Sequence, residues 1–232
     1  MATLGEYIGA GSGTTKLLLH LNGNSTDSSG NGNNGTDTSV TYGLGYGKFG
    51  QGAGFNGSSS NIKCGTTGIP TGAGARTLAT WMRFDSLPST SGQQYGIIHY
   101  GDNNTRLLFG FNIDFGTTPS NGIALVTYAD DLISSFIPSI NTWYRVVGTY
   151  DGNVTLKLYV NGQIYGTRTL SGALNTTMTV NGVVLGASLA GGDTLVNFFP
   201  GKLDETIIEN RVWSDSEARK DYTYAKGRFG II

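Results

Sequence analysis

Four polar residues in two distant segments carry the oxygen atoms that a calcium ion would need. Asp27, Asn31 and Asn33 lie in a long polar loop, and Asp204 stands at the start of a predicted strand near the C-terminus. Carboxylate, amide and backbone carbonyl oxygens are the hard ligands that calcium takes. The sequence therefore predicts a structural calcium ion that joins the loop to the late strand.

A second interpretation of the same residues needs no metal. Side chains alternate between the two faces of a strand, so we expect Asp204 to share the inward face with Thr206 and Ile208. A carboxylate on that face needs a partner. Backbone N–H groups could be this partner, and Asp27 could cap a turn within its loop. The loop also lacks the spacing and the final glutamate of an EF-hand, and both interpretations stay open.

Tyrosines near predicted loops are candidates for stacking against a sugar. Sugar sites combine exposed aromatic rings with amides and carboxylates that bind hydroxyl groups. Trp81 and Trp143 lie in predicted strands and are assigned to the core. The candidate ligand-binding residues are Tyr42, Tyr46, Tyr95, Tyr100 and Tyr128.

The groups that could act as nucleophiles or bases are isolated from one another. His20 and His99 each lie in an apolar run, where a lone histidine is usually packed and hydrogen-bonded. Cys64 is the single cysteine, so no intrachain disulfide can form, and its place at a strand end favours a buried thiol. No GxSxG, HExxH or P-loop motif is present. We therefore assign no catalytic residue.

The elements that would position these residues are short strands. Glycine makes up 37 of 232 residues and charged residues only 13%, which favours many turns over long helices. All-β sandwiches of roughly 200–250 residues commonly form one domain. A net charge of −1 without a lysine or arginine run argues against nucleic-acid binding. No apolar stretch approaches the roughly 18 residues of a membrane span.

Turn residues delimit the clearest strands. Asp151-Gly152 and Asn161-Gly162 separate three β-rich runs over residues 142–170, which predicts a three-stranded meander. Residues 76–84 alternate between two faces, as in a strand.

Later segments predict two more strands and one helix. Residues 183–187 and 203–213 have the composition of strands. Ser214 and Glu217 have the spacing of a capping box, which predicts a short helix that ends near Ala225, before Gly227.

The order of these segments resembles the laminin G-like, concanavalin A-like jelly-roll family. Residues 17–23, with their Asn-Gly turn, are similar to the opening strand of the family, and 48–57 to a later segment. Residues 143–162 resemble its hairpin, and 201–205 its last long strand. The resemblance covers about residues 16–226. It implies an all-β fold of two packed antiparallel sheets with one short C-terminal helix, in which calcium is commonly bound through loop oxygens.

The resemblance also bears on enzymatic activity. Retaining glucanases on this jelly roll use two glutamates four apart on one strand, the spacing of Glu205 and Glu209 here. Those enzymes place an aspartate between the two, but Ile207 occupies that position in this chain. An isoleucine does not tune the pKa values of the pair, so we expect no enzymatic activity.

The resemblance implies a binding or adhesion module whose partner is a glycan or a cell-surface receptor. The N-terminus lacks the features of a signal peptide, and a single cysteine allows no intrachain disulfide. A virion protein, for example of a phage, would fit both facts, and removal of a signal peptide or secretion by another route are the competing explanations. We expect it to fold in the cytoplasm and to act on the virion or extracellular surface. Residues 1–15 would be an arm that docks domain 16–232 onto other virion proteins, and the alternative is that they form the first strand of the domain. The alternatives are a decoration or assembly protein that binds only protein, and a glycoside hydrolase.

Overall fold

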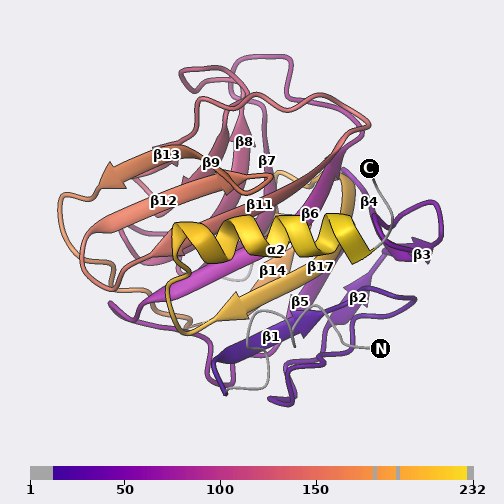
Figure 1. The fold of residues 1–232 in the computed structure, drawn as a ribbon. Coiled ribbons are helices and arrows are strands. Elements are labelled where there is room, and N and C mark those ends of the chain that lie inside the picture. Colours follow the sequence, from indigo (N-terminus) through magenta and orange to yellow (C-terminus); the bar gives the residue numbers. More distant parts are fainter. Residues whose placement is uncertain (1–12, 180–181, 192–193, 229–232) are drawn as a thin grey trace.

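A computed structural model of the chain describes residues 13–179, 182–191 and 194–228. It contains two large antiparallel sheets, a small hairpin and a C-terminal helix (Figure 1). This arrangement confirms the predicted two-sheet antiparallel jelly-roll sandwich with one short helix. Residues 1–12 of the predicted docking arm lie outside the described residues. Thr15, which the prediction also assigned to the arm, belongs to the first strand.

The two sheets differ in strand order and size. The eight-stranded sheet has the order β13 (Gln163–Thr169), β12 (Thr155–Val160), β11 (Trp143–Tyr150), β6 (Arg76–Phe84), β17 (Pro200–Glu209), β4 (Gly52–Asn56) and β3 (Thr41–Gly43), and β1 (Thr15–Leu19) also pairs with β17. The seven-stranded sheet has the order β10 (Leu132–Ile133), β9 (Ile123–Val126), β8 (Leu108–Asp114), β7 (Gln94–Gly101), β14 (Val183–Leu185), β5 (Asn61–Cys64) and β2 (Thr36–Thr38). A separate hairpin joins β15 (Ser188–Ala190) to β16 (Thr194–Val196).

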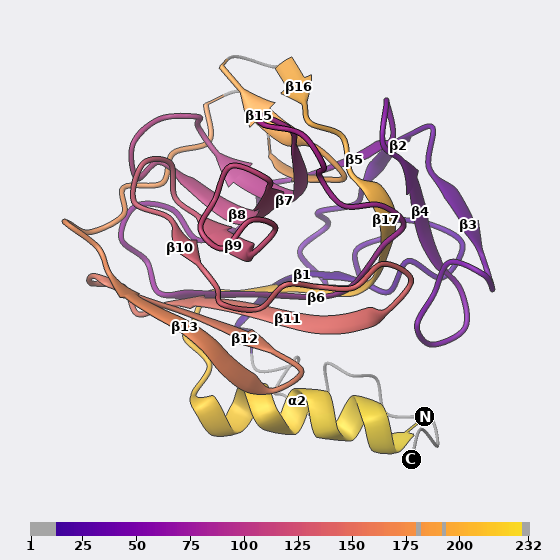
Figure 2. The same ribbon diagram turned by 90° about the horizontal axis from the view of Figure 1, so that it is seen from above.

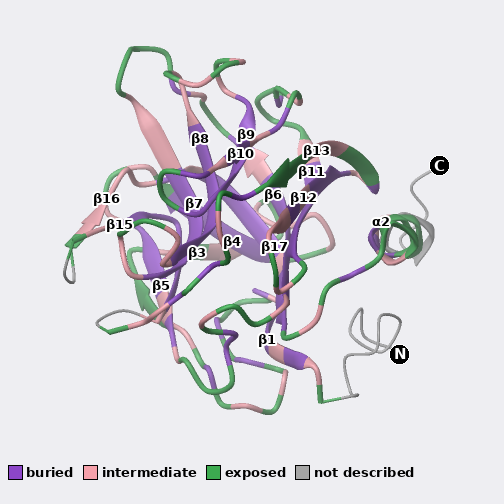
Figure 3. Cartoon of the chain, turned by 90° about the vertical axis from the view of Figure 1, so that its left-hand side faces the viewer, coloured by how far each residue is buried: buried purple, intermediate pink, exposed green. Residues whose placement is uncertain are grey.

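The core lies between the two sheets, and a second apolar cluster lies on the far side of the eight-stranded sheet. On β6, Leu78 and Met82 face the main core, whereas Ala79 and Trp81 face the second cluster. Helix α2 (Asp215–Arg228) covers that second cluster (Figure 2). Both faces of the central strands are therefore buried, whereas the edge strand β13 is largely exposed (Figure 3).

The predicted meander is present as β11, β12 and β13. Asn161 and Gly162 both have positive φ, at 51° and 75°, as a type I′ hairpin turn requires. At the other turn, Asp151 Oδ1 accepts hydrogen bonds from the backbone N–H groups of Asn153 and Thr155, each at 2.9 Å. The turn residues thus fixed the register of this part of the sheet.

The capping box is formed as predicted. The Glu217 backbone N–H donates to Ser214 Oγ at 3.3 Å, and the Ser214 N–H donates to Glu217 Oε2 at 2.8 Å. The helix runs to Arg228, through Gly227 and beyond the predicted end, because one glycine lowers helix stability by only about 1 kcal/mol.

Two strand boundaries differ from the prediction. The last long strand ends at Glu209 and not at Trp213. The backbone N–H of Trp213 donates to the side-chain oxygen Thr77 Oγ1, at 2.9 Å, instead of pairing with a neighbouring strand. The predicted strand 183–187 divides at Gly186, whose φ of 86° turns the chain from β14 into the β15–β16 hairpin. In the described part of the chain, no helix has the length and apolar character needed to cross a bilayer.

Candidate functional site

A small polar cavity lies on the outer face of the seven-stranded sheet. Strands β7, β8 and β9 contribute its floor, and the β15–β16 hairpin stands beside it, away from α2 (Figure 2). The cavity has a volume of about 210 Å³. Apolar walls come from Leu108, Val126 and Leu189. The polar residues that line the cavity include Gln94, His99, Asn103, Asn112, Tyr128, Asp131 and Ser188.

Strand alternation directs the two floor residues outward. Ile98 and Tyr100, the neighbours of His99, point into the main core, as do the neighbours of Asn112 on β8. Side chains of successive strand residues point to opposite faces. His99 and Asn112 therefore lie on the side away from the core, facing the cavity.

Two glycines allow the walls to approach the floor. A Cβ atom at Gly96 would collide with Ser188, so this glycine lets the hairpin pack directly onto β7. A Cβ atom at Gly110 would collide with the ring of His99, which lies across β8 at that point. Glycine at both positions thus brings Ser188 and His99 to the same cavity.

Three buried polar atoms in this cavity have no hydrogen-bond partner within the described residues: His99 Nε2, Asn112 Oδ1 and Ser188 Oγ. Their side chains belong to residues that are 2%, 8% and 5% exposed. Buried polar groups in native proteins are almost always hydrogen-bonded. Ordered water or a bound polar ligand would supply the missing partners.

The hydrogen bonds within the floor determine which donors and acceptors remain for a ligand. Burial lowers the pKa of His99 to about 4, and the backbone carbonyl of Phe111, which lies outside regular hydrogen-bond geometry, offsets this only in part, so the imidazole is neutral at pH 7. The Leu189 N–H donates to His99 Nδ1 at 3.4 Å, which leaves the hydrogen of the neutral ring on Nε2. Asn112 Nδ2 donates to Gln94 Oε1 at 2.9 Å. The floor therefore offers a donor at His99 and an acceptor at Asn112.

The rim adds an aromatic ring and a carboxyl group. Tyr128 is 43% exposed and has a positive φ of 63°. Asp131 Oδ1 accepts a hydrogen bond from the Thr127 N–H at 2.7 Å. Burial raises the pKa of Asp131, although backbone hydrogen bonds oppose the shift. Exposed aromatic surface beside convergent polar groups is typical of a ligand-binding site.

The five predicted tyrosines are not brought together. Of these, Tyr128 alone lines the polar cavity, and Tyr46 lines a smaller hollow of about 170 Å³ beside Asp85. Tyr42 donates its hydroxyl hydrogen to Asp37 at 2.8 Å, and Tyr95 accepts from Gln93 at 3.0 Å.

The prediction for Tyr100 needs correction. Its side chain is fully buried and its ring lies 5.7 Å from that of Phe109. Strand β7 extends to Gly101, so this residue belongs to a core strand and not to a loop.

The predicted calcium residues already bind other parts of the chain. Asp27 accepts four hydrogen bonds, from the backbone of Leu18, Ser29 and Asn33 and from Ser29 Oγ. Asn31 and Asn33 donate amide hydrogens to carbonyl groups of β1, at 2.9 and 2.8 Å. Within the described residues, no three His, Cys, Asp or Glu side chains are grouped as for a metal. These residues do not fit a calcium ion as they stand, and calcium binding stays a prediction that the melting temperature in EDTA checks.

The expected orientation of Asp204 is wrong. A bulge in β17 between Asp204 and Ile207 breaks the alternation of faces. Thr206 remains on the inner side, where its hydroxyl lies 2.8 Å from that of Thr80. Asp204 instead accepts hydrogen bonds from the backbone N–H groups of Lys48 and Phe49, at 2.8 and 3.0 Å. It is fully buried beside the α2-covered cluster.

The two strand glutamates are each held by the chain itself. Glu205 Oε2 lies 2.8 Å from His20 Nδ1. Glu209 Oε2 accepts from Trp213 Nε1 at 2.8 Å and lies 2.7 Å from Arg211 Nε. Neither carboxylate lines the polar cavity.

The Cys64 thiol is buried, as predicted, and burial raises its pKa to about 12, with smaller contributions from Asp27 and Asp37.

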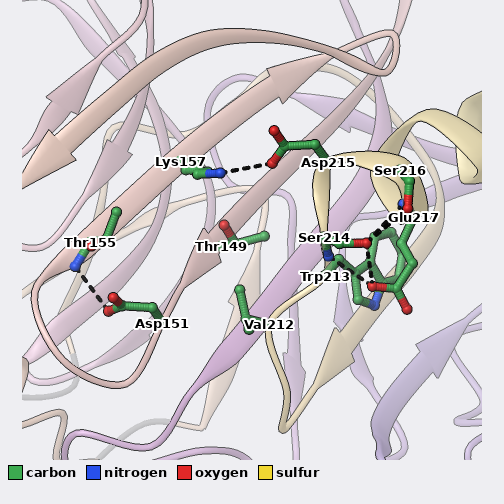
Figure 4. A pocket seen from close by; sticks show the side chains of 10 residues that line it. All are labelled: Thr149, Asp151, Thr155, Lys157, Val212, Trp213, Ser214, Asp215, Ser216 and Glu217. Atoms are coloured by element: carbon green, nitrogen blue, oxygen red, sulfur yellow. Dashed lines mark hydrogen bonds and ion pairs between the residues drawn. The ribbon is translucent and has the colours of Figure 1, made fainter.

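A larger cleft of about 660 Å³ lies between strands β11 and β12 and the start of α2 (Figure 4). Its charged groups already have partners within the chain: Lys157 Nζ donates to Asp215 at 2.8 Å, Glu217 belongs to the capping box, and Asp151 accepts backbone hydrogen bonds. Of the buried atoms without a partner in the part of the chain that the structure describes, none lines this cleft. The smaller cavity is therefore the better candidate.

Sequence reasoning missed most of this cavity. One local pattern does point to the cavity. In residues 109–113, alternation places the amide of Asn112 on the outer face of an otherwise apolar strand. No local pattern distinguishes His99 from a packed core histidine, because the hairpin that completes its surroundings is far away in the sequence.

The family and the fold are supported by comparison with known proteins. The model of the concanavalin A-like lectin/glucanases superfamily matches residues 56–219. Comparison with curated protein sequences gave no match.

Solved structures share the fold at low sequence identity. Domain 4 of AbnA, a GH43 extracellular arabinanase from Geobacillus stearothermophilus in complex with arabinotriose, is 18% identical with a TM-score of 0.69, covering 90% of this chain and 98% of that chain. The binding domain of Paraclostridial Mosquitocidal Protein 1 is 19% identical with a TM-score of 0.69, covering 96% and 53%. The receptor binding domain of botulinum neurotoxin D is 16% identical with a TM-score of 0.65, covering 96% and 54%. The chain thus spans about half the length of these toxin domains.

The family match covers well over half of the chain, and the two-sheet architecture agrees with it. The chain belongs to the concanavalin A-like lectin/glucanases superfamily.

Proposed function

We propose that this chain is a non-enzymatic carbohydrate-binding module whose sugar site is the polar cavity on the seven-stranded sheet. The observation that carries the proposal is the set of three buried polar atoms without partners, on His99, Asn112 and Ser188. Sugar hydroxyl groups can both donate and accept hydrogen bonds, so they can satisfy all three atoms. Tyr128 supplies an exposed ring at the rim.

The size of the cavity suits one sugar ring. Sites for drug-sized ligands have volumes of roughly 300–1,000 Å³, and this cavity has about 210 Å³. The module would thus hold a terminal residue or one residue of a longer chain. The complex of arabinanase domain 4 with arabinotriose supports a saccharide ligand by analogy of fold.

A non-enzymatic role fits the state of the carboxylates. Glu205 and Glu209 are each bound by neighbouring side chains and lie away from the cavity. Location on a virion, docking through residues 1–15 and a decoration role without sugar binding rest on the sequence alone and stay predictions.

Binding to a glycan array, followed by titration calorimetry on the best ligand, tests the proposal. Tyr128→Ala should weaken binding about tenfold, because exposed tyrosines at binding sites commonly contribute more than 1 kcal/mol. Tyr224→Ala on α2 is the matched control, since Tyr224 is 46% exposed and lies outside the cavity. It should bind as the unaltered protein does. An array without any bound glycan, or equal losses in both variants, would contradict the proposal.

A further inference from the structure

We infer that the polar cavity selects uncharged saccharides and rejects sugars that carry a carboxylate or a sulfate. This inference rests on the proposed sugar-binding function and specifies its ligand. Two properties of the cavity support it: the charges of the lining residues and the hydrogen-bonding capacity of the floor.

The charges around the cavity favour a neutral ligand. Among the lining residues that the structure describes there is no lysine or arginine, and the acidic residue is Asp131. The arginine that acts electrostatically on Asp131 is Arg168, and its guanidinium donates two hydrogen bonds to Asp130, at 2.9 and 2.6 Å. An anionic sugar would therefore meet the carboxyl group of Asp131, and no cationic side chain among the described lining residues could bind the anion.

The floor of the cavity also discriminates by hydrogen bonding. A carboxylate or sulfate oxygen only accepts hydrogen bonds. It could pair with His99 Nε2–H but would face the unpartnered Oδ1 of Asn112, which also only accepts. A hydroxyl group can accept from His99 and donate to Asn112 at the same time. Leaving a buried polar group unpaired commonly weakens binding about tenfold or more.

A cationic ligand is disfavoured for the converse reason. An ammonium group has donors and no acceptor. It could approach Asp131 but would leave the Nε2–H of His99 without a partner, because the Nδ1 atom already accepts from Leu189. The mixture of one donor, one acceptor and the Ser188 hydroxyl thus matches neutral polyols.

Matched pairs of saccharides test the inference by titration calorimetry. Galactotriose and trigalacturonic acid of the same linkage differ only at C6, where the acid carries carboxylates, and galactose and galactose 6-sulfate differ in one sulfate. We expect the acidic member of a pair that binds to have at least about tenfold lower affinity, from like-charge repulsion at close range and the unpaired acceptor. Equal or tighter binding of the acidic member would overturn the inference and leave the proposed function intact. Absence of binding by every neutral and acidic sugar would instead overturn the proposed function.

Two variants change the charge of the cavity in independent ways. Asp131→Asn removes the carboxylate and keeps an oxygen that can accept from the Thr127 N–H. Asn103→Lys adds a cation at a partly exposed lining position. Each variant should reduce the ratio of neutral to acidic affinity within a pair several-fold. Tyr224→Lys on α2 is the matched control and should leave this ratio unchanged. An unchanged preference in both folded variants would show that charge does not select the ligand.

Discussion

At the scale of single residues, Asp204 combines complete burial with an incomplete set of hydrogen-bond partners. Its Oδ2 atom accepts two backbone hydrogen bonds, whereas Oδ1 has no partner among the residues that the structure describes. Burial, and then the charge of Glu205, raise the pKa of Asp204 to about 8, although the backbone hydrogen bonds oppose the shift. The carboxyl group is thus protonated at neutral pH.

This shift makes Asp204 a source of pH-dependent stability. Its folded pKa of about 8 lies above the ordinary value of 3.8, so the folded protein keeps a proton that the unfolded chain has released. The stability contribution is complete below the unfolded pKa and is lost as pH rises through about 8. Asp204→Asn is neutral throughout and should become increasingly more stable than the unaltered protein between pH 4 and 8. The difference in free energy of unfolding between the two proteins should grow by at most about 1.4 kcal/mol per pH unit. Urea unfolding at several pH values measures this difference.

Asp130 provides a control of opposite sign. Burial raises the pKa of Asp130, but hydrogen bonds from Ser171 and Arg168 outweigh this and lower it to about 2. Its contribution is present at neutral pH and is lost on acidification. Asp130→Asn should therefore be less stable than the unaltered protein at pH 7 and approach it in acid. A flat difference for Asp204→Asn over pH 4–8 would refute the assignment.

At the scale of elements, the start of α2 depends on a reciprocal pair of hydrogen bonds. Ser214 and Glu217 satisfy backbone N–H groups that have no partner within the helix. Arg211 Nη1 also donates to Glu217 at 2.6 Å. These contacts set the point where the chain leaves β17 and turns back across the sheet.

Ser214→Ala should therefore lower the free energy of unfolding by about 1 kcal/mol, the usual effect of losing an N-cap. Ser91→Ala, at an exposed turn, is the control and should change it by less than about 0.5 kcal/mol. Chemical denaturation monitored by circular dichroism measures both. Equal stabilities of the two variants would show that the capping box does not contribute.

At the scale of the whole molecule, α2 is fastened to the eight-stranded sheet by a buried ion pair. Arg145 Nε donates to Asp221 Oδ2 at 2.6 Å, and both side chains are fully buried. Arg145 Nη1 also donates to the backbone carbonyl of Glu205 at 2.6 Å. One guanidinium thus joins β11, β17 and α2. Between β6 and α2, the rings of Trp81 and Tyr222 also pack together, with centroids 5.9 Å apart.

Removal of one partner should be costly. Asp221→Ala leaves the Arg145 charge buried without compensation, and such changes lower stability by about 3–5 kcal/mol. The double variant Arg145→Met/Asp221→Leu removes both charges and should be less destabilised than Asp221→Ala. Urea denaturation of the three proteins tests this order. A double variant at least as unstable as the single one would mean that packing, and not the uncompensated charge, dominates.

The sequence by itself determined the local features of this protein. Asn161-Gly162 specified a hairpin because few other pairs adopt two positive φ angles, and Ser214 with Glu217 specified a helix start. The alternation in residues 76–84 specified a strand and the faces of its side chains. The ordered set of such features also led to the correct fold family, since each depends on residues close together in the chain.

The tertiary structure alone decided the candidate site. Alternation shows that Asn112 points away from Phe111, but not which segment stands over that face. The β15–β16 hairpin brings Ser188 there, and it packs closely because position 96 has no side chain. The bulge at Glu205 likewise moved Asp204 off its expected face. Sites of this kind depend on contacts between segments far apart in the sequence, whose packing no local pattern encodes.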